Sequence, residues 1–201
     1  MDYIEDIAAL EALYGTPPEA AMRKVARSLT PTYRRWIMAS RLCMVSTVGP
    51  DGTDGSPRGD DGPVVLELDP QTLAMPDWRG NNRIDTLRNI VADGRISLMF
   101  MVPGSNNVVR VNGQARVTAD ADLRARFDRK GRQPATVIVI RIGEVYSQCA
   151  RALLRSRTWT SGDESAGLPT AGDILDEMTK GEIDGQVYDR DWAPRAAETL
   201  W

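Results

Sequence analysis

Hydrophobic and polar positions alternate most regularly between residues 109 and 117. The odd-numbered positions carry Val, Val, Gly, Ala and Val, while the even-numbered positions carry Arg, Asn, Gln and Arg. A period of two residues is typical of a β-strand that buries one face and exposes the other. We therefore expect a half-buried strand here.

Other apolar runs predict further strands. They cover residues 42–48, 64–68, 72–75, 95–102 and 136–142. Segments dense in turn residues separate them at 49–55, 69–71 and 103–106. One helix, at about 83–92, interrupts the strands, with Ile84, Leu87 and Val91 on one stripe. Strands joined mostly by short turns favour an antiparallel sheet closed into a barrel over a doubly wound parallel sheet.

Helical periodicity is expected mainly outside this region. The predicted helices cover residues 2–14, a segment from Pro17-Pro18 to about 28, a segment after Pro31, 120–127 and 171–179. In the first of them Tyr3, Ile7, Leu10 and Tyr14 share one face. We expect a helical appendage at 1–40, a barrel domain at 41–160 and a polar extension at 161–201 that packs on the barrel or on a partner subunit. The fold class is mainly β, with flanking N-terminal helices and short C-terminal helices.

Composition narrows the function. The 201 residues carry a net charge of −3, which gives no general attraction to nucleic acid or to a membrane surface. No apolar run approaches the ~20 residues of a membrane span, and no signal-peptide pattern is present, so a cytoplasmic protein is expected. The chain has no histidine, which excludes Ser-His-Asp, Cys-His and HExxH chemistry. Cys43 and Cys149 show no metal-binding spacing, and two buried thiols are favoured over a disulfide.

The segment 75–90 holds the strongest functional signal. A short strand ends there, and a loop with Asn81, Asn82 and Arg83 leads into the helix. Free backbone N–H groups, amide groups and a guanidinium at one helix N-terminus suit a phosphate monoester. In this interpretation Asn81 or Asn82 caps the helix and Arg83 supplies charge. The alternative is an ordinary capped helix with a surface arginine.

Two more motifs carry arginine. In segment 56–60, Arg58 stands between Pro57 and Gly59, so a shaped loop can hold it against a ligand. A charged surface turn is the alternative. In segment 149–159, three arginines surround Ser156 and precede Trp159. They form either a second arm that reaches an anionic ligand or a basic helical surface that Trp159 anchors.

Taken together, these motifs resemble the pyridoxamine-phosphate-oxidase-like flavoproteins, which are split β-barrels that bind FMN. The likeness is greatest to a subgroup of FMN-dependent proteins without an assigned substrate, and it spans about residues 35–165. The segments that carry it are 56–60, 73–77, 80–89, 103–104, 110–113 and 155–159. No GxGxxG motif follows a strand, so dinucleotide binding by a Rossmann fold is disfavoured.

The resemblance implies an antiparallel split β-barrel and a homodimer with flavin sites at the subunit interface. Asn82 and Arg83 stand at the positions of the basic pair that holds the FMN phosphate in the family, so one of the two basic residues is an amide here. Ser156, Arg157 and Trp159 would reach the partner's cofactor. The residues expected to bind FMN are Pro57, Arg58, Gly59, Pro76, Asp77, Asn81, Asn82, Arg83, Arg110, Ser156, Arg157 and Trp159. No metal site and no nucleic-acid partner are expected.

The resemblance also has departures. Vitamin B6 oxidases of this family use an arginine and a histidine near the C-terminus, and haem-degrading relatives rely on histidine, so both activities are disfavoured here. The predicted function is that of an FMN-dependent oxidoreductase that moves hydride or electrons to or from a small substrate. No catalytic side chain is assigned. The alternatives are a non-catalytic flavin-binding or sensing module, a deazaflavin-dependent relative, and a flavin-free barrel used for protein contacts.

Overall fold

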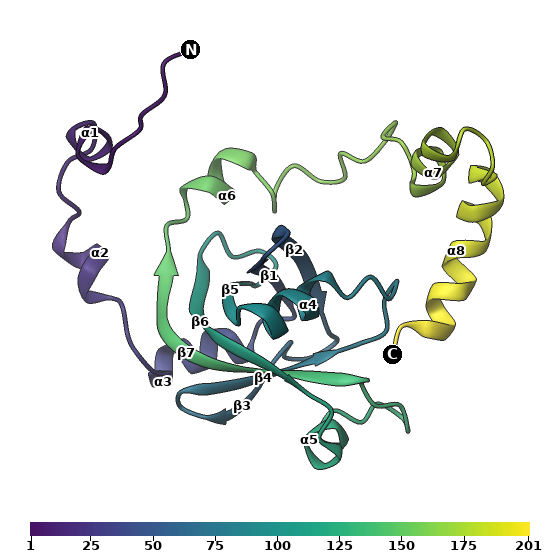
Figure 1. Cartoon of the computed structure of the whole chain (residues 1–201), viewed down its shortest axis with the longest axis horizontal. Coiled ribbons are helices and arrows are strands. Elements are labelled where there is room, and N and C mark those ends of the chain that lie inside the picture. Colours follow the sequence, from purple (N-terminus) through teal and green to yellow (C-terminus); the bar gives the residue numbers. More distant parts are fainter.

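The computed structural model describes residues 1–201, and one seven-stranded sheet lies at its centre (Figure 1). Its strands are β1 Leu42–Gly49, β2 Gly52–Gly59, β3 Leu66–Asp69, β4 Thr72–Asp77, β5 Arg95–Met101, β6 Val108–Thr118 and β7 Thr136–Gln148. Neighbours follow the order β2-β1-β5-β6-β7-β4-β3, and every pair is antiparallel. The predicted antiparallel, mainly β fold is confirmed.

The sheet curls but does not close. The strand order ends at β2 and β3, and no ladder joins these two strands. The strand pattern alone predicted a closed barrel, whereas the barrel in the structure is split. The long strands β6 and β7 carry the curl, and β7 bends strongly in Figure 1. Their register shifts between Asn112 and Gly113, which is the kind of irregularity that bends a strand. The two halves of the sheet can therefore face each other.

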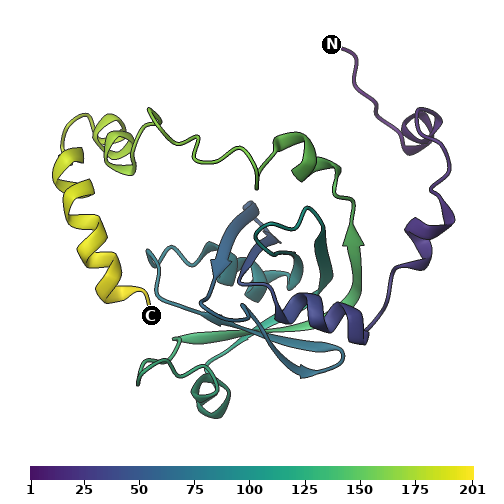
Figure 2. The ribbon, with the colours of Figure 1, turned by 180° about the vertical axis from the view of Figure 1, so that it is seen from behind.

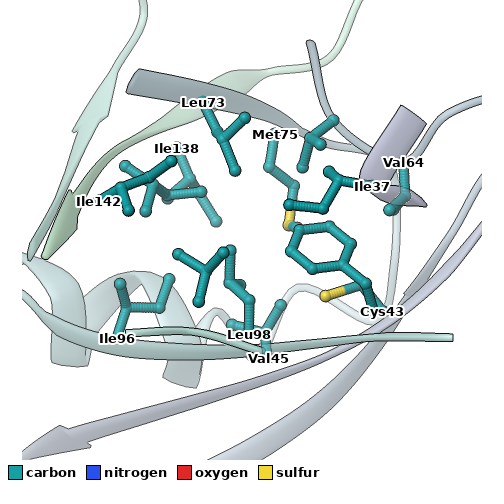
Figure 3. Packing of buried hydrophobic residues seen from close by; sticks show 14 of the residues in the cluster. Ile37, Cys43, Val45, Val64, Leu73, Met75, Ile96, Leu98, Ile138 and Ile142 are labelled. Atoms are coloured by element: carbon teal, nitrogen blue, oxygen red, sulfur yellow. The ribbon is translucent and has the colours of Figure 1, made fainter. Parts of the chain in front are cut away.

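The core fills the space between these halves (Figure 3). Leu73 and Met75 of β4 lie across from Ile96 and Leu98 of β5, and all four side chains are buried. Further buried members of the cluster are Ile37, Cys43, Val45, Val64, Phe100, Val109, Val111, Ile138, Ile140 and Ile142. Burial of apolar surface stabilises a folded protein by about 25 cal/mol per Å². Because this cluster holds most of the buried hydrophobic side chains, it is the main source of the free energy of folding.

Eight helices surround the sheet. They are α1 Ile7–Ala12, α2 Glu19–Arg23, α3 Pro31–Met38, α4 Asp85–Ala92, α5 Ala121–Ala125, α6 Arg151–Ser156, α7 Ala171–Thr179 and α8 Gly185–Thr199. The predicted bounds of α7 are confirmed. None of the eight has the length and apolar character that a membrane crossing needs.

Three expectations about these elements were wrong. The first two helices are shorter than predicted, and no residue of α1 is buried, because that segment lies away from the sheet (Figure 2). The tail holds a second helix, α8, which contains Pro194 and lacks a strong amphipathic pattern. Segment 52–59 is strand β2 rather than a turn-rich loop. Pro57 is tolerated there because β2 lies at the edge of the sheet.

An ion pair attaches α3 to the sheet. The guanidinium of Arg34 donates from Nε and Nη2 to the two carboxylate oxygens of Glu67, at 2.5 and 2.6 Å. This hydrogen bonding lowers the pKa of Glu67 below its ordinary value. A depressed folded-state pKa stabilises the protein above the unfolded pKa of about 4.3, and that contribution is lost as the pH falls.

We therefore predict that Glu67→Gln reduces the acid sensitivity of the fold. Urea midpoints at pH 7 and at pH 4 measure it. The variant is expected to be less stable than the parent at pH 7, with a smaller loss on going to pH 4. Glu164→Gln, at an exposed position in the tail, is the control and should keep the parent's pH dependence. An unchanged pH dependence in Glu67→Gln would contradict the assignment.

Candidate functional site

A cleft of about 1850 Å³ lies at the split of the barrel. One wall is edge strand β2, and the other is the end of β4 with the loop 78–84 that leads into α4. Arg58 of β2 and Asp77 of β4 form an ion pair of 2.5 Å across the split. Across the opening, edge strand β2 is therefore joined to β4 by an ion pair rather than by a β-ladder.

Strand register explains why Arg58 faces this cleft. Arg58 pairs with Cys43, whose side chain is in the core, so both side chains lie on the inner face of the sheet. Burial raises the pKa of the Cys43 thiol to about 12, so this thiol stays protonated. Cys43 and the exposed Cys149 are unpaired, and no disulfide forms. The prediction of two buried thiols is correct for Cys43 alone.

Two buried polar atoms at the cleft have no hydrogen-bond partner. They are Nε of Arg58 and Oγ1 of Thr136. Thr136 begins β7 and pairs with Asp77, so both atoms belong to residues that flank the same carboxylate. Buried polar groups are nearly always hydrogen-bonded, and an unmet one costs about 1–3 kcal/mol. The Nε atom of Arg58 and the Oγ1 atom of Thr136 are therefore suited to hydrogen bonds with polar atoms of a ligand.

The loop before α4 differs from its predicted form. The helix begins at Asp85, and Ile84 stands at the N-cap in a left-handed conformation with φ of 55°. Neither Asn81 nor Asn82 caps it, because the Asn81 side chain accepts from the Arg83 N–H at 3.1 Å and closes a turn just upstream. No side chain caps the helix. The backbone N–H groups at its N-terminus therefore have no capping side chain, and Asp85 places a carboxylate in the first turn.

The buried stripe of α4 also differs from the prediction. Ile84 and Val91 are 47% and 78% exposed, whereas Thr86 and Ile90 are buried. Leu87, the third residue of the predicted stripe, does pack against the core, so the prediction is correct for Leu87 and wrong for Ile84 and Val91. Thr86 donates from Oγ1 to Asp54 of β2 at 2.5 Å, which fixes the start of the helix against the cleft wall. The polar contact explains why a threonine occupies a buried position.

Arg83 lies in the same cleft as Arg58. Its Nε contacts the Asp85 carboxylate at 2.9 Å, and its side chain is 75% exposed. Exposed ion pairs contribute about 0–1 kcal/mol, so a doubly charged anion can compete for this guanidinium. Eight of the twelve predicted binding residues line this one cleft: Pro57, Arg58, Gly59, Pro76, Asp77, Asn81, Asn82 and Arg83.

The other four lie outside the cleft of their own chain. The Trp159 indole donates to the Ser105 carbonyl at 2.8 Å and anchors the segment after α6 to the turn between β5 and β6. Ser156 and Arg157 end the same short helix. Arg110, on β6, places its guanidinium 5.5 Å from the ring centre of Tyr146, and its Nε is buried without a partner.

Sequence patterns missed a second group of cleft residues. The Asp60 carboxylate accepts from the Trp78 indole at 3.2 Å and from Arg129 at 2.8 Å, and its side chain is only 4% exposed. Trp78 in turn meets Trp201 edge to face, with ring centres 5.3 Å apart. These partners are far apart in the sequence, so no local motif joins them.

Replacing Asp60 tests whether this group holds the cleft wall. Asp60→Ala leaves the indole and the loop N–H groups of residues 61 and 62 without their acceptor. We expect a loss of about 2 kcal/mol in the free energy of unfolding, measured by urea denaturation. Asp61→Ala is the matched control, because Asp61 contacts the same Arg129 at 3.0 Å but is 66% exposed. Equal effects of the two changes would contradict this role.

The side chains of the site can bind and orient a ligand, and none of them is a histidine. The chain lacks histidine, and no group of three or more His, Cys, Asp or Glu side chains is placed to hold a metal ion. At one end of the cleft lie a helix N-terminus without a capping side chain, an exposed arginine and two asparagine amides, a set of groups that suits an anion. Any redox chemistry must therefore come from a bound group.

Comparisons with known proteins bear on the family and the fold. A family model described as "Pyridoxamine 5'-phosphate oxidase" matches residues 29–149. No curated protein matches the chain. Among solved structures, HupZ of Group A Streptococcus is 18% identical with a TM-score of 0.50, and the match covers 59% of this chain and 93% of that one.

Two further solved structures are less similar. A Clostridium acetobutylicum protein related to general stress protein 26 is 12% identical with a TM-score of 0.45, over 58% of this chain and 85% of that one. A protein described as an F420 reductase is 17% identical with a TM-score of 0.42, over 60% and 98%. At these identities the likeness concerns the fold alone.

Proposed function

The chain belongs to the pyridoxamine 5'-phosphate oxidase family, and from this premise we propose that it binds FMN in the cleft and acts as an FMN-dependent oxidoreductase on a small substrate. One observation carries the proposal. Arg58 from an edge strand and Arg83 from a helix N-terminus line one cleft, beside buried polar atoms that lack partners. Convergence of these motifs is what a phosphorylated, ring-bearing cofactor requires.

The phosphate would be held at the start of α4. A phosphate monoester carries about −1.5 to −2 charges at pH 7, and the uncapped helix N-terminus and Arg83 both favour that charge. The Asn82 amide can add a neutral donor. Hydrogen bonds to charged groups contribute about 1.5–3 kcal/mol each, which exceeds what the exposed Arg83–Asp85 pair gives up.

The flavin ring would lie along the split. Pro57 and Pro76 provide apolar surface, while Arg58 Nε and Thr136 Oγ1 offer hydrogen bonds that the protein itself leaves unmade. Asp77 holds Arg58 in place through their ion pair. FMN, when bound, supplies hydride and electron transfer, so a site without histidine can still support redox catalysis. The absence of histidine argues against vitamin B6 as the substrate.

A homodimer is the second part of the proposal. A row of side chains crosses the outer face of the sheet in register, formed by Pro57, Met44, Met99, Arg110 and Tyr146. This row is only partly buried, and Arg110 Nε has no partner within the chain. A second copy seated on this face would cover the row. Ser156, Arg157 and Trp159, outside their own cleft, would then serve the partner's flavin.

Chromophore identification tests the function. The purified protein is denatured, and the released compound is identified by absorbance and mass. Release of FMN would support the proposal. Release of a deazaflavin would show that the cofactor is a deazaflavin and not FMN. A colourless protein that does not bind added FMN would overturn the proposal. Reduction of the bound flavin by a nicotinamide donor, followed by reoxidation with candidate substrates, separates an enzyme from a sensing module. Sedimentation equilibrium gives the number of subunits. A monomer would contradict the proposal that two subunits share each flavin site.

A further inference from the structure

The residues Glu198–Trp201, here called the strap, form part of the cleft wall although they belong to the tail. Glu198, Leu200 and Trp201 all line the cleft. The family match ends at residue 149, and the HupZ structure is matched over 93% of its length by 59% of this chain. The strap is therefore an addition to the shared barrel that reaches the barrel's cleft.

The strap is held by a small, well-defined set of contacts. Arg132 donates from one nitrogen to the backbone oxygen atoms of Glu198 and Trp201, at 2.6 and 3.2 Å. The Trp201 ring meets Trp78 edge to face at 5.3 Å, and the Arg129 guanidinium lies 5.6 Å from its centre. These two bonds from Arg132 are the hydrogen bonds that join residues 162–201 to the barrel.

The rest of the tail is a unit of its own. Helices α7 and α8 approach so closely that a Cβ on Gly172 would lie 2.1 Å from the Gly185 carbonyl, and the Gly172 N–H donates to Asp189 at 2.9 Å. Figures 1 and 2 both show this pair standing apart from the sheet, with the end of α8 returning to it. The linker 157–170, which contains glycines at positions 162 and 167, connects the pair to α6.

We propose that the strap is a gate on the cleft, closed by docking of Trp201 on Trp78 and Arg129 and opened by movement of the α7–α8 unit on its linker. All of the groups that close it belong to this chain, so it closes without a ligand contact. The few contacts that hold it make a closed state that opens at modest cost. The inference rests on the proposed function only in its choice of FMN as the probe.

Rates separate a gate from a ligand contact. A gate slows entry and exit alike, whereas loss of a contact to the ligand mainly speeds release. Trp201→Ala removes the edge-to-face pair and the cation–π contact. We expect FMN association and release, followed by stopped-flow flavin fluorescence, to become faster by on the order of tenfold each, while the dissociation constant changes far less. Trp201→Phe keeps a ring against Trp78 and should stay close to the parent.

Two controls make the test decisive. Trp192→Ala changes the tryptophan of α8, which is 53% exposed and outside the cleft, and should leave both rates unchanged. Docking itself is measured without FMN, from the NMR signal of the Trp78 indole N–H, which Trp201→Ala should shift and Trp192→Ala should not. An unmoved signal overturns the proposal whether or not FMN binds. Faster release with unchanged association also overturns it, because Trp201 would then be a ligand contact.

Failure of the proposed function gives a different result. If neither parent nor variants bind FMN, the cofactor assignment is wrong, and the NMR measurement alone decides whether the strap docks in the cleft.

Discussion

Arg83→Glu is expected to weaken FMN binding by at least about a hundredfold. The change removes a charge-assisted hydrogen bond of about 1.5–3 kcal/mol and adds a carboxylate that repels the phosphate. It also places that carboxylate at a helix N-terminus that has no capping side chain. Because Arg83 is 75% exposed, its loss should leave the free energy of unfolding nearly unchanged. Titration of the apoprotein with FMN, followed by flavin fluorescence, measures the effect.

Arg88→Glu is the matched control. Arg88 lies on the same helix, is exposed, and does not line the cleft. The two variants have the same net charge, so a general electrostatic effect would weaken FMN binding equally in both. We expect Arg88→Glu to bind nearly as tightly as the parent, particularly at 0.15 M salt, where exposed charges more than about 8 Å apart are largely screened. Equal losses of FMN affinity in the two variants would contradict the proposal that the phosphate binds at the start of α4.

Elements with local signals could be predicted from the sequence. The alternation at 109–117 reflects the geometry of a strand between a core and a polar face, and β6 covers it. Helix α7 is bounded as predicted, and a capping box of Thr170 and Asp173 defines its start. The antiparallel pairing of the strands also followed, because strands joined by short turns pair as antiparallel neighbours, whereas the order of the strands in the sheet was not predicted.

The remaining features depend on contacts that no local pattern encodes. β2 contains three glycines and a proline, so it resembles a turn until its pairing with β1 is known. The cap of α4 was assigned to an asparagine because Asn caps helices often, but the Asn81 side chain bonds a turn upstream. The Asp60–Arg129 pair and the docking of Trp201 join residues from distant segments. Arg58 and Arg83 share a cleft only because the open sheet curls until edge strand β2 faces the end of β4 and the loop that follows it.

The curl of the sheet that creates this cleft leads to the prediction with the largest effect on stability. At Gly113 a Cβ atom would lie 2.0 Å from the Arg141 carbonyl oxygen, far inside any contact that a side chain tolerates. The obstacle is backbone of the paired strand, so it cannot move aside without breaking the β6–β7 ladder at its register shift. We therefore expect Gly113→Ala to destabilise the fold by ~3 kcal/mol or more, measured by urea denaturation.

Gly55→Ala separates this effect from the general consequences of replacing a strand glycine. Gly55 lies in β2, and a Cβ there meets no atom within 4 Å. That variant should be as stable as the parent or slightly more stable, because alanine restricts the unfolded chain more than glycine does. If Gly113→Ala proved equally harmless, β6 and β7 could not approach as closely as described. The sheet would then be flatter at this point, and the split that holds Arg58 and Arg83 in one cleft would lose its structural cause.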